Sequence, residues 1–244
     1  MASRPNETRV IAFKQNPAAF IDHTNLKPSS LQSDIDRLCE EAIKFNFKSV
    51  CVHPCWIKRC KEKLKSSGVE ICTVIGFPLG SNCCSTKAYE GKLAIEDGAT
   101  EIDLVMNVGL FLSSQMDKAN QTELLGSFKQ DILKTVEILQ NCALKVIIET
   151  SLLQADHISK VSQLLSDIPQ VSFIKTSTGF NGQGATVENV RLIREVCQEK
   201  CDVKASGGIK TLNDCIALVE AGAGRIGTSS GVNIMEEWAA CRNN

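Results

Sequence analysis

The sequence lacks any long apolar run and any marked excess of charge of one sign. No stretch approaches the roughly 18 apolar residues of a membrane-spanning helix, and the first residues lack the charged and then apolar segments of a secretory signal. The formal net charge is −1, and no basic patch predicts binding to nucleic acid or to a membrane surface. We therefore expect a soluble, cytoplasmic protein whose partner is a small molecule.

The chain also has no Pro-, Gly- or Ser-rich linker that would divide it. Its 244 residues, 43% of them hydrophobic, can bury one full core, so we expect residues 1–244 to form a single domain. Cysteine is plentiful, but the 12 residues are scattered through apparent strands and helices instead of following the pattern of a small secreted disulfide scaffold. Buried, reduced thiols are the simpler interpretation.

Short apolar, β-rich runs alternate along the chain with longer amphipathic segments. Eight such runs recur at roughly the 30-residue spacing of a βαβ step, and the widest gap follows the fourth. Between them, apolar residues recur three and four positions apart, as in Ile35, Leu38, Ala42 and Phe45. The pattern predicts a (β/α)8 barrel, with an open doubly wound sheet as the alternative. The expected strands are centred near Ile21, Val50, Val74, Val105, Ile147, Ile174, Val203 and Ile226.

Two lysines stand at the ends of neighbouring predicted strands, where a barrel builds its active site. Lys175 ends the sixth run, and Lys204 lies in the seventh. Neighbouring strands are about 4.8 Å apart, so two such ammonium groups could repel one another. Repulsion and burial both favour the neutral amine, which can attack a carbonyl. We assign Lys175 as nucleophile and Lys204 as its cationic neighbour, although spacing alone permits the reverse; a surface position for Lys175 is the simpler alternative.

Acidic residues interrupt two other strands. Asp103 shares strand parity with Val105 and Asn107, so it is expected to face the barrel interior as a general base or as a counter-charge for the lysines. Asp22 has the same two interpretations, and a structural ion pair is the simpler alternative for both. His23 has the opposite parity to Asp22 and is expected to be a hydrogen-bonded packing residue.

Glycine-rich turns follow the last two predicted strands, at Ser206–Gly207–Gly208 and from Gly227 to Gly231. Each alone is more often a simple turn. Together, after the seventh and eighth strands, they occupy the usual phosphate position of a barrel, where glycines allow close approach and helix-start amides favour an anion.

The segment Cys51–x–His53–x–Cys55 contains three potential metal ligands at alternate positions, but we do not expect a metal site there. Strand alternation would place all three side chains on one face, and no second ligand pair of zinc-finger spacing follows. Cys83 and Cys84 are interpreted as an inert loop pair.

Seven blocks of the sequence resemble the deoxyribose-phosphate aldolase family, class I aldolases with a (β/α)8 barrel. FIKTSTGF from Phe173 and KASGGI from Lys204, in this order, are the specific ones, and the resemblance spans nearly the whole chain. The other blocks are IDHTNLKP, SVCVHP, EIDLVMNVG, KVIIET and RIGTSSGV.

The resemblance implies reversible cleavage of 2-deoxy-D-ribose 5-phosphate to acetaldehyde and D-glyceraldehyde 3-phosphate, without a metal or an organic cofactor. Lys175 would form the imine, Lys204 would tune it and Asp103 would take part in proton transfer. A homodimer is a further implication. Residues implied to bind the substrate are Asp22, Thr24, Cys51, Thr178, Gly179, Gly207, Gly208, Gly227, Ser229 and Ser230.

Three positions depart from some family members. Those members end in a mobile tail with a terminal Tyr, whereas the only tyrosine here is Tyr89, so we expect no assistance from a tail tyrosine. Phe180 stands where some members have Lys, and His53 where some have Asn. Phosphate affinity and pocket polarity are therefore expected to differ.

Three other functions fit the same residues. A different class I aldolase or a transaldolase would need more hydroxyl-binding groups for a larger ketose donor. A barrel that binds pyridoxal phosphate also combines a Schiff-base lysine with a phosphate site. A non-catalytic phosphosugar sensor would bind without turnover.

Overall fold

The computed structural model describes residues 5–139 and 142–242. Eight parallel strands pair in sequence order, and β1 pairs with β8 to close the barrel. This confirms the (β/α)8 prediction and excludes the open sheet. All eight expected strand centres fall inside a strand. The strands are β1 Ile21–Asn25, β2 Ser49–Val52, β3 Glu70–Ile75, β4 Glu101–Val105, β5 Ala143–Ile147, β6 Val171–Lys175, β7 Asp202–Ser206 and β8 Arg225–Thr228.

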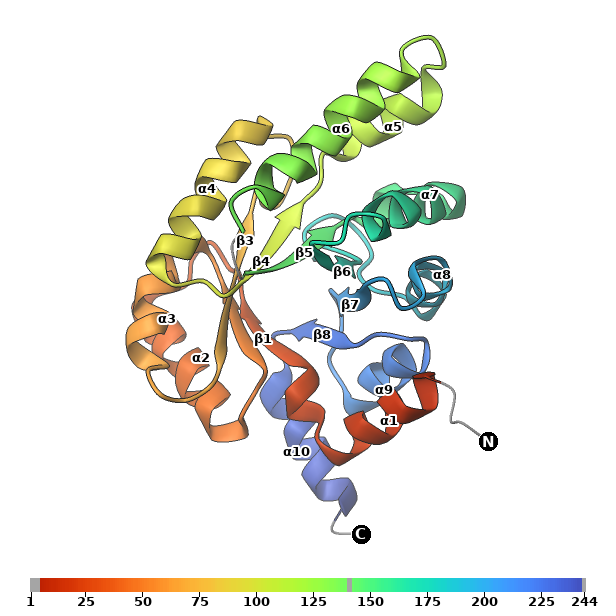
Figure 1. The fold of residues 1–244 in the computed structure, drawn as a ribbon. Coiled ribbons are helices and arrows are strands. Elements are labelled where there is room, and N and C mark those ends of the chain that lie inside the picture. The colour runs from red at the N-terminus through yellow and green to blue at the C-terminus, as the bar shows by residue number, and fades with distance from the viewer. Residues whose placement is uncertain (1–4, 140–141, 243–244) are drawn as a thin grey trace.

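Helices cover the outside of the barrel (Figure 1). α2 to α9 lie between successive strands, α1 precedes β1 and α10 follows β8. They are α1 Pro5–Gln15, α2 Gln32–Phe45, α3 Ile57–Lys63, α4 Cys84–Asp97, α5 Val108–Met116, α6 Gln121–Val136, α7 Ala155–Ser166, α8 Val187–Cys197, α9 Leu212–Glu220 and α10 Gly231–Arg242, with 3-10 turns η1 Pro17–Phe20, η2 Pro54–Trp56 and η3 Thr150–Leu152.

The wide gap after the fourth strand holds two helices. α5 and α6 form an antiparallel pair that projects from the barrel (Figure 1). Apolar residues three and four positions apart also occur here: Ile132 and Val136 lie in α6, whereas Leu139 lies beyond its end. Cys83 and Cys84 also differ from the prediction of a loop pair, because they cap and begin α4.

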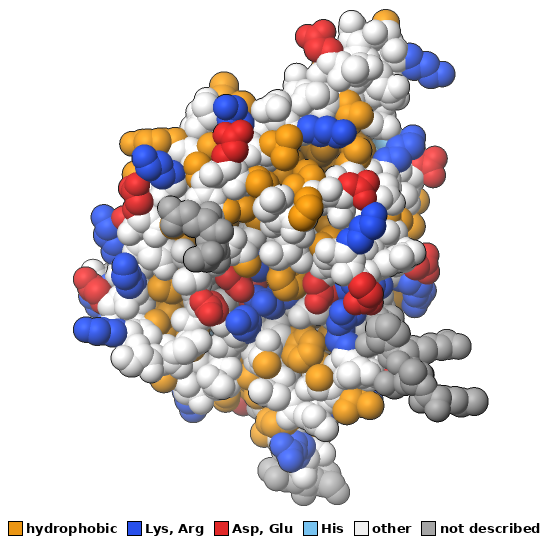
Figure 2. All heavy atoms as spheres, in the orientation of Figure 1, with side chains coloured by type: hydrophobic (Ala, Val, Ile, Leu, Met, Phe, Trp, Pro, Cys, Tyr) orange, Lys and Arg blue, Asp and Glu red, His pale blue; other side chains and the backbone are white. Residues whose placement is uncertain are grey.

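The main core lies between the strands and the helices, as in Ile35, Ile102 and Val161, none of which is exposed. A second, small cluster is formed by Leu26, Cys51, Cys72 and Val74, with Phe77 packed against it. On the outside, acidic and basic side chains are interspersed over the face that Figure 2 shows. Within the described residues, no helix is both long and apolar enough to cross a membrane.

Candidate active site

Lys175 is the last residue of β6, at the carboxyl end of the barrel. Its side chain is only 3% exposed, yet it contributes to the wall of a cavity of about 440 Å³ at this end. Strand position explains the placement, because the carboxyl ends of all eight strands meet here. The lysine therefore combines burial with access to a small molecule, and the simpler alternative of a surface position is excluded.

Asp103 binds both predicted lysines through one oxygen. Lys175 and Lys204 are directly paired in the register of β6 and β7, and each Nζ lies 2.7 Å from Asp103 Oδ2. The two amines thus lie close together, as predicted. They do not simply repel, because the carboxylate from β4 lies against both.

A third lysine, which the sequence reasoning missed, contacts the other oxygen of Asp103. Lys145 of β5 is fully buried and donates to Asp103 Oδ1 at 2.9 Å. It also lies 2.8 Å from Glu101 Oε2 and 3.3 Å from the sulfur of Cys72. Its inward strand parity was a usable signal, since Lys145 is paired with Asp103 in the register of β4 and β5.

Asp22 and Arg225 complete the network on the other side. Lys204 Nζ lies 2.6 Å from Asp22 Oδ2, and Arg225 lies 2.7 Å from Asp22 Oδ1 and 2.9 Å from Glu101 Oε2. Asp22 is therefore a buried ion-pair partner of Lys204. The sequence reasoning identified Asp22 but missed Glu101 and Arg225.

This network contains one more basic group than acidic groups. Lys145, Lys175, Lys204 and Arg225 stand against three carboxylates, Asp22, Glu101 and Asp103. Burying an uncompensated charge is costly, so the set is balanced when one amine is neutral. Lys175 is the amine that reaches the cavity, whereas Lys145 and Lys204 are fully buried.

The pKa values of the buried partners agree with this balance. Burial would lower the pKa of Lys204 and of Lys145, but the carboxylates around them, Asp103 foremost, raise both above the ordinary lysine value. Burial would raise the pKa of Asp103, but Lys145, Lys175 and Lys204 hold it well below its usual range. Lys204 and Lys145 are therefore ammonium groups and Asp103 a carboxylate at neutral pH.

Most of the residues that were expected to bind substrate line the cavity. Asp22 and Cys51 are fully buried and do not line it, so contact between either residue and a substrate stays a prediction. Cations that the sequence reasoning did not identify also line it, Lys27, Arg37 and Lys210. The expected residues in its wall are Thr24, Lys175, Thr178, Gly179, Gly207, Gly208, Gly227, Ser229 and Ser230.

The glycine turns have steric reasons for their sequence. A Cβ at Gly227 would lie 2.3 Å from Ser206 Oγ and 3.1 Å from Lys204 Cε, so a side chain there would displace the lysine. Gly207 has φ +90° and packs against Gly184, where a Cβ would lie 2.1 Å from the Gly207 carbonyl oxygen. Ser230 immediately precedes α10, whose first amides can bind an anion.

Glu149 positions the loop that follows Lys175. This buried residue has a left-handed backbone, φ 55°, and its carboxylate accepts hydrogen bonds from the Thr178 amide at 3.2 Å, from the Thr178 hydroxyl and from Asn181. The sequence reasoning did not identify it, because its partners lie about 30 residues further along the chain. Thr178 is thereby fixed in the cavity wall.

Phe180 and His53, which differ from the residues of some family members, both pack against Phe77 beside the cavity. Phe180 is 51% exposed, lines the cavity and packs edge-on against Phe77, with ring centroids 5.2 Å apart. Phe77 in turn packs against His53 at 5.9 Å. The cavity therefore has an apolar edge where a lysine would have supplied charge.

The Cys51–x–His53–x–Cys55 segment separates in space, although not for the reason that we predicted. β2 ends at Val52, so strand alternation does not continue to His53 or Cys55. Cys55 is exposed in η2, whereas Cys51 is buried beside Cys72 and Asp103. His23 behaves as predicted for a packing residue: its ring lies against Phe47, and Nε2 is 2.6 Å from Glu41 Oε2.

A family model described as DeoC/LacD family aldolase matches residues 18–237. The chain belongs to the DeoC/LacD aldolase family. A deoxyribose-phosphate aldolase of Mannheimia succiniciproducens is 47% identical over 222 residues, which cover 91% of this chain and 95% of the relative. One of Thermoanaerobacter sp. (strain X514) is 44% identical over 223 residues, 91% of this chain and 97% of the relative.

Solved structures of this aldolase family share the fold. The deoxyribose phosphate aldolase of Aeropyrum pernix, described as a tetramer, superimposes with a TM-score of 0.84 at 27% identity. The match covers 99% of this chain and all of the other. The similarity thus extends over the whole barrel, including every strand that contributes to the lysine network.

Proposed function

We propose that this chain is a class I aldolase that reversibly cleaves 2-deoxy-D-ribose 5-phosphate to acetaldehyde and D-glyceraldehyde 3-phosphate. The observation that carries the proposal is the contact of Lys175 and Lys204 with one oxygen of Asp103, at the edge of a cavity. The second support is the similarity of the chain to relatives that are named deoxyribose-phosphate aldolases.

Lys175 is the nucleophile in this proposal. Of the three lysines in the buried network, Lys175 is the one that lines the cavity. Its attack on the C1 aldehyde, followed by loss of water, forms an iminium that withdraws electrons from the C2–C3 bond. Lys204 stays beside Asp103 as a fixed cation next to Lys175.

Asp103 and Lys204 serve the proton transfers. Removal of the C3 hydroxyl proton breaks the C2–C3 bond, releases glyceraldehyde 3-phosphate and leaves an enamine on Lys175. Protonation at C2 and hydrolysis then release acetaldehyde and restore the amine. Asp103 Oδ2, 2.7 Å from Lys175 Nζ, is within reach of protons around the imine.

The phosphate is placed at the turns after β7 and β8. Gly207, Gly208, Ser229 and Ser230 line the cavity together with Lys210, so backbone amides, hydroxyl groups and one ammonium meet there. This arrangement supports anion binding at this edge of the cavity. The apolar Phe180 edge predicts weaker phosphate binding than a lysine at that position would give.

Turnover distinguishes this function from the alternatives. With 2-deoxyribose 5-phosphate, we expect glyceraldehyde 3-phosphate and acetaldehyde in equal amounts, and with the two aldehydes we expect the reverse reaction. Binding of the sugar phosphate without product would favour a sensor. A requirement for a ketose donor would favour another aldolase, and visible absorption from an imine-linked cofactor would favour a pyridoxal phosphate barrel.

We also propose a cytoplasmic location and a homodimer. The location is supported by the twelve free cysteines, seven of which are buried, since reduced thiols suit a reducing compartment. The dimer rests on the family resemblance alone. Light scattering on the purified protein tests it directly.

A further inference from the structure

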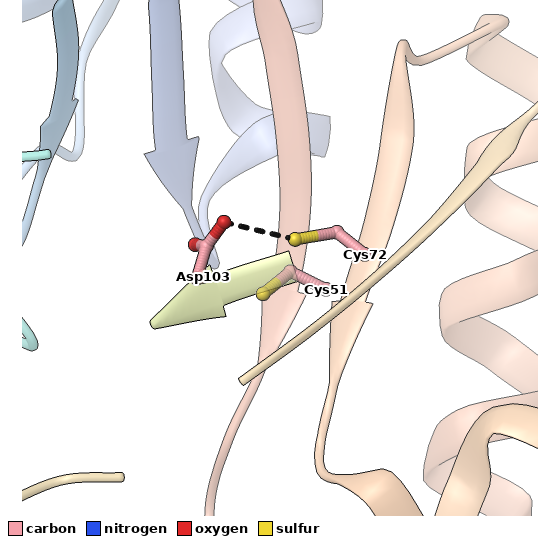
Figure 3. A group of neighbouring side chains, drawn as sticks. All are labelled: Cys51, Cys72 and Asp103. Carbon is pink, nitrogen blue, oxygen red and sulfur yellow. Dashed lines mark hydrogen bonds between the residues drawn. The ribbon is translucent and has the colours of Figure 1, made fainter. Parts of the chain in front are cut away.

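Three donor groups that the aldolase mechanism leaves partly unused meet inside the barrel. Cys51, Cys72 and Asp103 come from the neighbouring strands β2, β3 and β4, and each is fully buried. One donor atom of each, two sulfurs and a carboxylate oxygen, all lie within 4.8 Å of one another. Figure 3 shows the two sulfur atoms on the side of the strands that faces Asp103.

We propose that Cys51, Cys72 and Asp103 form a binding site for a thiophilic divalent cation such as Zn²⁺, and that occupancy inhibits the enzyme. The inhibitory part rests on the proposed aldolase function, whereas the binding part does not. The metal takes no part in the aldolase reaction in this proposal.

The donor spacing suits a tetrahedral ion. Zn²⁺ binds sulfur at about 2.3 Å and carboxylate oxygen at about 2.0–2.2 Å, which places tetrahedral donors roughly 3.4–3.8 Å apart. Cys72 Sγ already lies 3.2 Å from Asp103 Oδ1, and Cys51 is directly paired with Cys72 in the strand register. Small side-chain rotations therefore bring three ligands into place, with a fourth position for water.

The exchange of charge is also balanced. Zn²⁺ displaces one proton from each thiol, so two protons leave as two positive charges enter, and the net charge of the buried network is unchanged. Lys145 Nζ, 3.3 Å from Cys72 Sγ, stabilises a thiolate at that position. Lys145 would lose its contact with Asp103 Oδ1 but keep Glu101, 2.8 Å away.

Inhibition follows from the two oxygens of Asp103. Oδ1 faces Cys72 and Lys145, and Oδ2 faces Lys175 and Lys204. A cation on Oδ1 withdraws electron density from the carboxylate and weakens Oδ2 as a proton acceptor. Imine formation on Lys175 is then retained while the proton transfers slow, and the onset is slow because the site is buried.

Co²⁺ provides a test that is independent of activity. The exposed or partly exposed Cys55, Cys83, Cys84, Cys142 and Cys241 are first replaced by Ser, to remove surface thiols. In this background we expect one equivalent of Co²⁺ to give sulfur-to-cobalt charge-transfer bands and the visible bands of a tetrahedral ion. Cys51→Ala and Cys72→Ala should each abolish or strongly reduce them. Cys215→Ala, a buried thiol in α9, is the matched control and should leave them unchanged.

Zinc X-ray absorption keeps the proposal testable if either alanine variant fails to fold. The zinc-loaded serine background should show two sulfur ligands at about 2.3 Å. Zn²⁺ should also lower turnover at least tenfold, reversibly with a chelator, while borohydride still traps substrate on Lys175. Absent cobalt–thiolate bands, bands that persist in Cys72→Ala, or zinc bound without sulfur would each overturn the site; a metal-free protein without turnover would instead overturn the aldolase.

Discussion

Lys145 Nζ lies 2.9 Å from Asp103 Oδ1, on the oxygen that neither Lys175 nor Lys204 contacts. This ion pair is fully buried. It compensates part of the Asp103 charge, while Oδ2 contacts Lys175 and Lys204. We therefore propose that Lys145 positions the carboxylate for the proposed proton transfers.

Lys145→Met tests this role. Removing one partner of a buried ion pair should cost about 3–5 kcal/mol of unfolding free energy, and the reoriented carboxylate should lower kcat by at least tenfold. Denaturant unfolding and steady-state kinetics measure the two effects. Lys87→Met is the matched control, because Lys87 is also buried and lies 2.8 Å from Asp131, outside the site. Equal losses of kcat in the folded fraction of both variants would argue against a positioning role.

Asp103→Asn keeps the shape of the side chain but removes its charge. We expect kcat to fall by about 10²–10⁴-fold, the range typical of a lost general acid–base group. Asp131→Asn removes another buried carboxylate and should keep kcat within a fewfold of the original. A fully active Asp103→Asn enzyme would exclude Asp103 from proton transfer.

Stability should depend on pH in two windows. The pKa values of Asp22 and Asp103 are lowered on folding, so the stability that they contribute is present above the unfolded value of 3.8 and is lost as the pH falls below it. The pKa values of Lys145 and Lys204 are raised, so their contribution is present below 10.5 and is lost as the pH rises above it. Melting temperatures measured across the pH range should show a plateau between these limits, and a maximum confined near one limit would contradict the network.

Phe180→Lys should strengthen phosphate binding. Phe180 lines the cavity at its edge and is half exposed, so a lysine there can place its ammonium toward the bound phosphate. We expect KM for 2-deoxyribose 5-phosphate to fall severalfold with kcat nearly unchanged. Unphosphorylated 2-deoxyribose is the control substrate, and an equal change in its KM would show that charge at this edge does not act through the phosphate.

The fold was largely predictable because its pattern repeats. Eight apolar runs at βαβ spacing predicted the strand count, and strand parity predicted that Asp103 faces the barrel interior, where it contacts Lys175. The projecting α5–α6 pair was not predicted, since a wide gap does not specify its contents. That residues 1–244 act as one domain stays a prediction.

The pairing of Lys175 with Lys204 was easier to predict than its surroundings. Lys175 and Lys204 lie on adjacent strands, so sequence spacing alone relates them. Arg225 reaches Glu101 from a strand 124 residues away, and this contact exists only once the barrel closes. Glu149 was hidden for a similar reason, because its partners Thr178 and Asn181 lie about 30 residues further along the chain.

The identity of the imine-forming lysine is the central claim, and trapping tests it most directly. The protein is incubated with 2-deoxyribose 5-phosphate, reduced with borohydride and mapped by peptide mass spectrometry, while Lys87 serves as a buried lysine that should remain unmodified. We predict a single reduced adduct on Lys175, lost in Lys175→Met. An adduct on Lys204 with Lys175 unmodified would reverse the two roles, and the absence of any adduct during turnover would contradict Schiff-base catalysis.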